Sequence, residues 1–158
     1  MTSLTRRGAI FLLLAPLAAC GASGGRDARL DPNDPPLHAN ETPELRRQIN
    51  RYADLYGVPR GLVHRVILRE SHHRPGARNG PYFGLMQILP ETARGMGYDG
   101  RAEGLLDAET NLKYAVKYLR GAWLVADGSH DRAVMWYSKG YYYEAKRRGM
   151  LQVTGLRA

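Results

Sequence analysis

The sequence is poor in several features that define large protein classes. Its 158 residues include one cysteine, Cys20, so an intramolecular disulfide is excluded. No segment alternates apolar and polar residues as a half-buried β-strand does, and no internal repeat occurs. No glycine-rich loop follows a predicted strand, which disfavours a nucleotide site. These absences leave a chain whose apolar residues recur mainly at helical spacing.

The chain also lacks an apolar run long enough to cross a membrane. Its most apolar stretch, residues 8–19, follows Arg6 and Arg7 and is shorter than the roughly 20 residues that a spanning helix needs. A positive start before a short apolar segment is the layout of an export signal. A buried N-terminal helix is the alternative, but the stretch has no polar face. We therefore predict an export signal over residues 1–19, with the general and the twin-arginine routes both open.

The lone cysteine lies where this apolar stretch ends. Residues 17–20, Leu-Ala-Ala-Cys, followed by Gly21, resemble the lipobox of bacterial lipoproteins. That resemblance implies cleavage before Cys20, a diacylglycerol on its sulfur and acylation of its new amino group, which together give stable anchoring. A free thiol in an uncleaved signal is the alternative. We expect the chain to be lipid-anchored in the cell envelope, at the periplasmic face of the outer membrane, while retention at the inner membrane stays open.

The charge of the chain is strongly positive. The formal net charge is +8, and removal of residues 1–19 would take away Arg6 and Arg7 and no acid, leaving +6. A basic exported protein suits anionic cell-wall polymers or lipid head groups. Nucleic acid is not an expected partner, because export takes the chain out of the cytoplasm. Residues 20–41 are rich in Gly, Asp, Pro and Ala without a hydrophobic period, which predicts a flexible tether.

Residues 42–150 carry the helical signals, and residues 151–158 are expected to form a C-terminal tail. Thr42 and Pro43 predict a helix start and Gly57 its end. Further helices are expected from Pro59 to Glu70, Pro90 to about Met96, after a cap at Asp107 to Gly128, after a cap at Asp131 to Gly140, and within Tyr141 to Arg148, with a short helical turn over Leu85 to Ile88. The predicted class is mainly α, with several short helices around one core.

One carboxylate interrupts an apolar helix face. Leu62, Val66 and Glu70 are spaced by four residues and therefore share a face of the predicted helix. Burial at such a position would raise the pKa of Glu70, as a general acid working near neutral pH requires. The alternative is a glutamate that ends the helix in water or pairs with an arginine.

Two other groups of polar residues are weaker candidates. Ser129, His130 and Asp131 contain the residue types of a catalytic triad, but adjacent residues in a turn cannot converge, so we interpret them as a turn and a helix cap. The side chains of His72 and His73 should diverge, and no cysteine or spaced carboxylate–histidine set accompanies them. We therefore predict no metal site and no cofactor.

Five short motifs follow one another along the chain. They are Glu70-Ser71, Gly84-Leu85-Met86-Gln87, the segment 106–112, Tyr118-Leu119, and Trp136-Tyr137-Ser138-Lys139-Gly140. In this order and spacing they resemble the catalytic domain of the soluble-lytic-transglycosylase type, related to goose-type lysozyme. The resemblance covers roughly residues 45–149. It implies a lysozyme-like single domain of short helices around a substrate cleft, with peptidoglycan glycan strands as the substrate.

The resemblance assigns roles to residues that match the motifs. Glu70 would be the catalytic acid and base. The substrate-binding residues would be Ser71, beside the acid or as an ordinary cap, Asn79 in the following loop, Gly84, Met86 and Gln87 on the cleft floor, Tyr137 with its hydroxyl toward the acid, and Ser138. Relatives usually have asparagine at the position of Ser138, and the shorter hydroxyl puts that substrate contact in doubt.

The resemblance also implies a reaction. The bond between N-acetylmuramic acid and N-acetylglucosamine would be cleaved with formation of a 1,6-anhydro end, Glu70 acting first as acid and then as base. A lysozyme-type hydrolase that uses water, and a non-catalytic glycan-binding envelope lipoprotein, are the alternatives. Partners among envelope proteins, and endo- or exo-acting cleavage, stay open.

Overall fold

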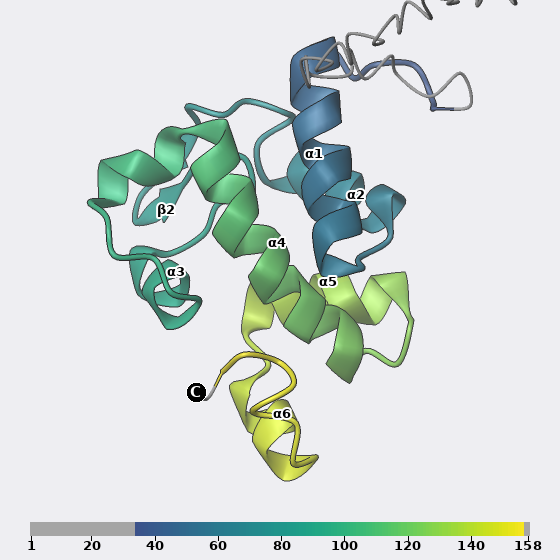
Figure 1. The fold of residues 1–158 in the computed structure, drawn as a ribbon, viewed down its shortest axis with the longest axis vertical. Coiled ribbons are helices and arrows are strands. Elements are labelled where there is room, and N and C mark those ends of the chain that lie inside the picture. Colours follow the sequence, from purple (N-terminus) through teal and green to yellow (C-terminus); the bar gives the residue numbers. More distant parts are fainter. Residues whose placement is uncertain (1–33, 157–158) are drawn as a thin grey trace, which may run out of the picture.

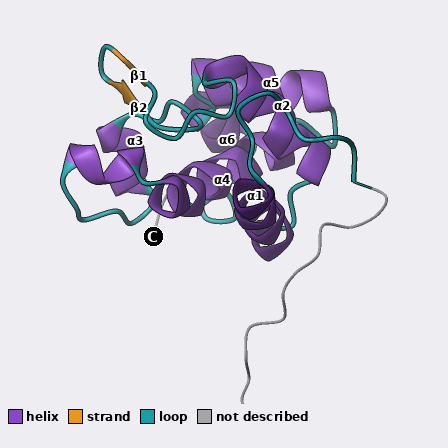
Figure 2. Ribbon diagram, turned by 90° about the horizontal axis from the view of Figure 1, so that it is seen from above, coloured by secondary structure: helices purple, strands orange, loops and turns teal. Residues whose placement is uncertain are grey.

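The computed structural model describes residues 34–156, which form a mainly helical domain (Figures 1 and 2). Within this range are six α-helices, one 3₁₀ helix and one small hairpin. In chain order they are α1 (Pro43–Tyr56), α2 (Arg60–Glu70), β1 (Arg78–Asn79), β2 (Tyr82–Phe83), α3 (Pro90–Gly95), η1 (Ala102–Leu106), α4 (Ala108–Val125), α5 (His130–Lys139) and α6 (Tyr142–Arg147). The expectation of a mainly α domain of short helices is confirmed.

The first helix begins and ends where its local signals predict. The Thr42 hydroxyl accepts a hydrogen bond from the Leu45 amide at 3.1 Å, and Pro43 occupies the first helical position. Gly57 ends the helix with φ of 62°, a left-handed conformation that glycine adopts at little steric cost. The start and stop of α1 are therefore set by its own sequence.

The central element is α4, which packs against both α1 and α5 (Figure 1). Its N-cap is Asp107, whose carboxylate accepts from the Thr110 amide at 2.8 Å. One face of the helix is fully buried in the core by Leu112, Ala115, Val116, Leu119 and Ala122. Burial of a leucine or valine side chain stabilises the fold by about 1.5–3 kcal/mol. This stripe therefore makes α4 the axis of the domain.

The start of α5 differs from the expectation. The cap is Ser129, whose hydroxyl accepts from the Arg132 amide at 3.4 Å, and Asp131 lies inside the first turn. Both residues are acceptable caps, so the sequence alone did not separate them. Asp131 instead forms an ion pair with Arg65 of α2, with 2.6 Å between Oδ1 and the guanidinium nitrogen. The interpretation of this segment as a turn and a helix cap is unaffected.

Residues 84–87 form a turn rather than a helix, after the hairpin formed by β1 and β2. The turn is held against α4 by Asn111, which is fully buried. Its amide nitrogen donates to the carbonyls of Phe83 and Leu105 at 2.9 and 2.8 Å, and its amide oxygen accepts from the Met86 backbone at 3.0 Å. Each of these bonds satisfies a polar group that would otherwise be buried without a partner.

The turn requires glycine at position 84. Gly84 has φ of 75°, and a Cβ there would lie 2.2 Å from Asn111 Nδ2 and 2.3 Å from the Leu105 carbonyl oxygen. Any side chain would therefore displace the amide that holds the turn.

The folded domain begins before the predicted boundary at residue 42. Glu41 and Arg46 form a buried ion pair at 2.6 Å, and the guanidinium of Arg46 also donates to the carbonyls of Pro35 and Pro36. The expectation that the tether extends to residue 41 is therefore wrong for residues 34–41, because a buried arginine fixes this segment. At the other end, Thr154 is buried and Leu156 packs on the core, so residues 151–156 belong to the domain.

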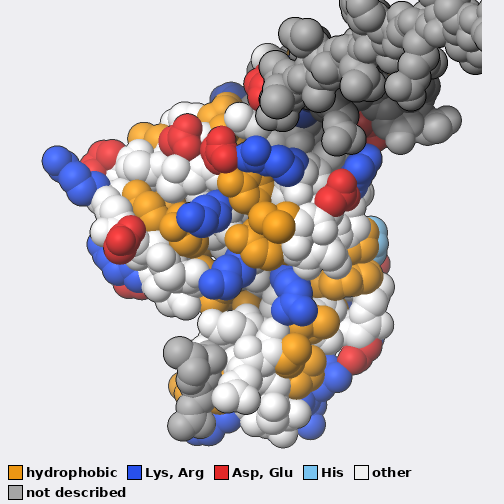
Figure 3. Space-filling view, in the orientation of Figure 1, with side chains coloured by type: hydrophobic (Ala, Val, Ile, Leu, Met, Phe, Trp, Pro, Cys, Tyr) orange, Lys and Arg blue, Asp and Glu red, His pale blue; other side chains and the backbone are white. Residues whose placement is uncertain are grey.

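Basic side chains do not gather in a single patch on the face shown in Figure 3, where Lys and Arg alternate with acidic and hydrophobic side chains. Several cations are paired with acids, as in the Arg60–Asp54 and Arg148–Asp127 contacts. No helix within residues 34–156 has the length and apolar character to span a bilayer. The predicted signal and Cys20 lie outside the described residues.

The surroundings of Gly84 and Gly61 predict opposite changes in stability when each glycine is replaced by alanine. Gly84→Ala should destabilise the domain by about 2–4 kcal/mol, because it combines a steric clash with a left-handed backbone. Gly61→Ala, in the exposed face of α2 with nothing near its Cβ, should stabilise it by about 0.5–1 kcal/mol. Chemical denaturation of the three proteins measures both. Equal stability of the Gly84 variant and the parent would contradict the role of the turn.

Candidate functional site

Glu70 is the last residue of α2 and lies at the edge of the core. The preceding turns bury Leu62, Val66 and Ile67 completely or almost completely, whereas the Glu70 side chain keeps 23% of its exposure. Within residues 34–156, no hydrogen bond to its carboxylate is formed. The nearest cation is Arg69, whose Nε lies 3.8 Å from Oε1 and whose own side chain is largely exposed. The carboxylate is thus partly desolvated and weakly paired.

This environment changes the acidity of Glu70. Burial raises its pKa above the ordinary value of a glutamate, and the charge of Arg69 opposes that rise. A group whose pKa is raised by folding stabilises the folded state while it is protonated, and this contribution is lost as the pH rises through the folded-state pKa. Above that pKa the ionised carboxylate therefore weakens the fold. Glu70 is not placed there to stabilise the protein.

Tyr137 of α5 lies close enough to Glu70 for their charges to interact. Burial raises the pKa of Tyr137 well above that of a free tyrosine, and the Glu70 charge adds to the rise. The Tyr137 hydroxyl donates to the Met86 carbonyl at 2.8 Å rather than to the Glu70 carboxylate. Its role in this structure is to join α5 to the turn at residues 84–87. The expectation that the hydroxyl points toward the acid stays a prediction, since the Glu70 charge acts on this hydroxyl while its hydrogen bond goes to Met86.

The turn residues do not all face outward. Met86 is fully buried, so its side chain has no surface with which to contact a glycan, which corrects that expectation. Its backbone N–H instead donates to the Asn111 side-chain oxygen, and its carbonyl accepts from the Tyr137 hydroxyl. Gln87 is partly exposed and has φ of 47°, and its side-chain amide donates to the carbonyls of Gly84 and Ala77. Its buried Oε1 has no partner among the described residues.

The other predicted contact residues differ in accessibility. Ser71 is buried and ends α2, with its hydroxyl donating to the Ile67 carbonyl at 3.3 Å, so it acts as a cap and not as a surface group. Asn79 is exposed in β1. Ser138 is exposed at the end of α5, but its hydroxyl donates to the Val134 and Met135 carbonyls of its own helix. The structure therefore brings together Glu70, Tyr137 and the turn, and leaves Ser71 and Ser138 turned toward their helices.

Sequence reasoning missed the role of Asn111. This residue was part of a motif but was not expected to position the turn. A signal for it exists, since Asn111 is four residues before Ala115 and therefore lies on the apolar face of α4. A polar amide on such a face must find buried partners. Those partners are Phe83, Leu105 and Met86. Phe83 and Met86 lie 25 or more residues from Asn111 in the sequence, so local patterns could not identify them.

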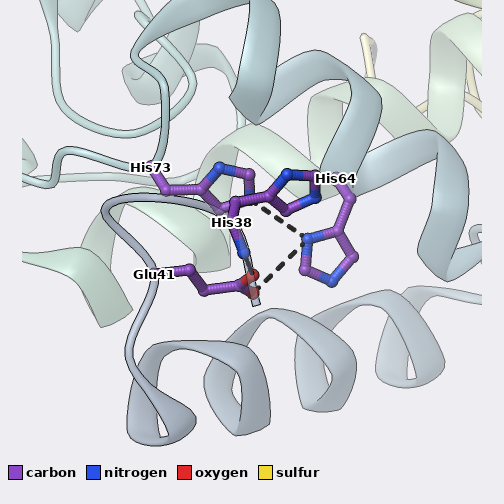
Figure 4. A group of neighbouring side chains, drawn as sticks. All are labelled: His38, Glu41, His64 and His73. Carbon is purple, nitrogen blue, oxygen red and sulfur yellow. Dashed lines mark hydrogen bonds and ion pairs between the residues drawn. The ribbon is translucent and has the colours of Figure 1, made fainter. Parts of the chain in front are cut away.

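A second group of polar side chains lies between α2, the turn that follows it and the segment before α1. His38, Glu41, His64 and His73 each place one ligand-type atom within 4.8 Å of the others (Figure 4). Burial lowers the pKa of both His64 and His73 to about 4, so their rings are neutral at pH 7. Burial opposes the ionisation of Glu41, but hydrogen bonds from Arg46 and the His38 amide hold its pKa below the ordinary value. The cluster thus combines the neutral imidazoles of His64 and His73 with an ionised carboxylate.

Comparison with known proteins identifies the family. A model of the transglycosylase SLT domain matches residues 47–151. A relative in Shewanella woodyi, named membrane-bound lytic murein transglycosylase F, is 36% identical over 95 residues, which are 56% of this chain and 19% of the relative. The chain thus spans about a fifth of that protein. No solved structure gave a significant match. The family model covers Glu70, the turn and Tyr137, and we conclude that the chain belongs to the family of transglycosylase SLT domains.

Proposed function

We propose that the protein is a peptidoglycan lytic transglycosylase. It cleaves the β-1,4 bond between N-acetylmuramic acid and N-acetylglucosamine and leaves a 1,6-anhydro end on the muramoyl residue. Membership of the SLT family and the name of the Shewanella woodyi relative, a lytic murein transglycosylase, support the substrate class. The observation that carries the residue assignment is the environment of Glu70, a partly buried carboxyl group with a raised pKa on which no second carboxylate of residues 34–156 acts.

In the proposed reaction a single carboxyl group serves two steps. Protonated Glu70 donates its proton to the bridging oxygen as the bond from that oxygen to the muramoyl C1 breaks and an oxocarbenium-like centre develops. The resulting carboxylate then removes the proton from the muramoyl C6 hydroxyl. The C6 oxygen bonds to C1, which closes the anhydro ring, consumes no water and returns Glu70 to its protonated form.

The electrostatics of Glu70 favour this scheme over a two-carboxylate mechanism. Ordinary glycosidases place a second acid about 5–9.5 Å from the first. Among residues 34–156, Arg69 is the one charged group that shifts the pKa of Glu70. Other acids have partners of their own, such as Glu144 with Arg147 and Glu103 with Arg101. Glu91 lies exposed in the first turn of α3. An intramolecular nucleophile on the sugar therefore suits the site better than a second protein carboxylate.

The groups around Glu70 have proposed roles that follow from their contacts. Tyr137 and Asn111 fix the backbone of the turn at residues 84–87, so that the exposed part of Gln87 faces the glycan. Gly84 permits the close approach that this needs. Asn79 on the hairpin is proposed to bind the sugar. Ser71 supports the acid through the helix end, and Ser138 can bind glycan only by giving up its hydrogen bonds within α5.

We also propose that the domain works at a membrane surface. Residues 1–19 would direct export, and the lipidated Cys20 would hold the domain in the envelope through the residues before Asp34. The relative in Shewanella woodyi is named as membrane-bound, which is consistent with this location. Labelling of cells with an alkyne fatty acid, followed by purification of the chain, would test the anchor, and Cys20→Ala should abolish the label.

Replacement of the acid should remove activity without harming the fold. Glu70→Gln should reduce release of anhydro-muropeptides from purified sacculi by at least about 1,000-fold, because neither the glutamine amide nor a water molecule can donate the proton that the bridging oxygen needs. Its melting temperature at pH 7 should equal or exceed that of the parent, since an ionised, partly buried carboxylate is removed. Glu91→Gln, an exposed acid outside the site, is the matched control and should keep full activity.

Mass spectrometry of the products separates this proposal from its rivals. A hydrolase would give reducing ends that are one water heavier than anhydro ends. A non-catalytic binding protein would bind sacculi without releasing fragments, before and after the Glu70 substitution. Wild-type turnover in Glu70→Gln would exclude the assignment of the acid.

The pH dependence of activity should report Glu70 directly. The first step needs the protonated acid, so kcat/KM should fall as the pH rises through the raised pKa of Glu70. Arg69→Gln removes the cation that lowers this pKa and should move the alkaline limb to higher pH. Arg47→Gln, a partly exposed cation on α1 paired with Glu44, is the control and should leave the limb in place. A limb that moves to lower pH in the Arg69 variant would contradict the role of Glu70 as the acid.

A further inference from the structure

The cluster of His38, Glu41, His64 and His73 draws its members from three separate segments. His38 and Glu41 precede α1, His64 lies within α2, and His73 follows the end of that helix. Figure 4 shows the three rings and the carboxylate grouped together, and the rings of His38 and His73 are stacked with 4.4 Å between their centroids. Imidazole nitrogens and a carboxylate oxygen are donors that Zn²⁺ binds in proteins. The proposed cleavage reaction does not use any of the four side chains.

The separations within the cluster match those of a metal site. Nδ1 of His64 lies 3.2 Å from Nε2 of His73 and 3.6 Å from Oε1 of Glu41. A tetrahedral zinc ion with bonds of about 2.0–2.1 Å separates its ligand atoms by about 3.3–3.4 Å. These two distances therefore bracket the required value. The wider separations, up to 4.8 Å, would shorten on binding.

Hydrogen bonds around His64 aim its free lone pair into the cluster. Nε2 of His64 lies 3.3 Å from Oδ1 of Asn50, and Nδ2 of Asn50 donates to Asp34 at 3.1 Å. The contact with Asp34 fixes the orientation of the Asn50 amide, so its oxygen can only accept the proton on Nε2. Nδ1 of His64 is then unprotonated in the neutral ring and faces His73 and Glu41. Metal-bound histidines generally have such a partner on the other nitrogen.

Without a cation, His73 cannot satisfy both of its nitrogens. The ring is fully buried, and its Nδ1 has no hydrogen-bond partner in the described part of the chain. If Nε2 carries the proton and donates to His64, a lone pair on Nδ1 is buried alone. If Nδ1 carries it, two lone pairs face each other 3.2 Å apart. A cation between His64 Nδ1 and His73 Nε2 binds both of these facing lone pairs and removes their repulsion, while the Nδ1–H of His73 keeps no acceptor among the described residues.

The charge balance also permits a cation. Arg46 binds both oxygens of Glu41 at 2.6 Å and is the arginine of residues 34–156 that pairs with this carboxylate, while Asp34 also acts on Arg46. Two carboxylates against one guanidinium leave a net negative charge beside the rings. Carboxylates that bind metals commonly accept hydrogen bonds as well.

The backbone after α2 takes an uncommon path to bring His73 into the cluster. His72 and His73 have φ of 52° and 59°, which non-glycine residues rarely adopt. These two residues turn the chain so that the His73 ring is buried while the His72 ring is exposed. Asn40 donates to the His72 carbonyl at 2.8 Å, which ties the segment before α1 to the same turn. Strain of this kind points to a function of the turn.

We propose that His38, Glu41, His64 and His73 form a structural zinc site that fastens the segment before α1 to the turn following Glu70. Four protein donors complete a tetrahedral shell, so no position is open for a substrate or a reactive water. Bound zinc would hold the end of α2, and with it the position of Glu70, against the N-terminal segment. The site does not depend on the proposed cleavage reaction, and its tests read metal and stability instead of activity.

The experiment uses the chain without a polyhistidine tag, stripped of metal by a chelator. Titration with ZnCl₂ should give one bound Zn²⁺ per chain by calorimetry and by elemental analysis after gel filtration. The melting temperature should rise by about 5 °C or more at saturating zinc, because the ion binds the folded state. Co²⁺ in place of zinc should give the visible absorption of a tetrahedral ion.

Two adjacent histidines provide a matched pair of variants. His73→Asn removes a ligand, whereas His72→Asn changes its exposed neighbour, and asparagine tolerates the left-handed backbone at both positions. The first should weaken zinc binding by at least about 100-fold and abolish the thermal shift, and the second should change affinity by less than about 3-fold. His38→Ala, at a half-exposed ligand, tests the site again if His73→Asn folds poorly. Absence of stoichiometric zinc in the parent, or equal affinity in all variants, would overturn the proposal.

Discussion

The hydrogen bonds of one buried amide, Asn111, hold together the parts of the molecule that surround the candidate acid. The amide joins the turn at residues 84–87 to the start of α4 and to η1. The same turn accepts a hydrogen bond from Tyr137, which connects it to α5, and α5 in turn packs on α2, the helix that ends at Glu70. Because every buried polar group in this series has a partner, movement of one element would leave others unsatisfied. The position of Gln87 relative to Glu70 is therefore a property of the core.

Glu70 shows the opposite arrangement. It lies at the end of an apolar helix, accepts no hydrogen bond from the described residues and has a loose contact with one exposed cation. The same domain that gives the buried Asn111 amide three partners leaves this carboxylate poorly solvated, which lowers stability and raises the pKa together. Such a local conflict between stability and placement is expected at functional positions.

Features that depend on residues close together in the sequence were predicted correctly. Features that depend on contacts between distant segments were not. The caps at Thr42 and Asp107, the end at Gly57 and the apolar face of α4 follow from local chemistry and are present. The burial of Met86 and Ser71 depends on what packs over them, and spacing along one helix does not contain that information. The tether was placed too far along the chain because the guanidinium that binds Pro35 and Pro36 comes from Arg46. The histidine cluster was missed for the same reason, since its members lie on three segments.

The folding of residues 34–41 onto the domain limits the distance between the enzyme and a membrane. If Cys20 carries the lipid, the chain that separates it from the domain ends near Asp34, and its contour is at most about 50 Å, compared with about 75 Å for a tether ending at residue 41. On that proposal, the ion pair of Arg46 with Glu41, deep in the domain, would set which layer of the cell wall Glu70 can reach. Glycan strands farther from the bilayer than this contour plus the width of the domain would lie outside its working range.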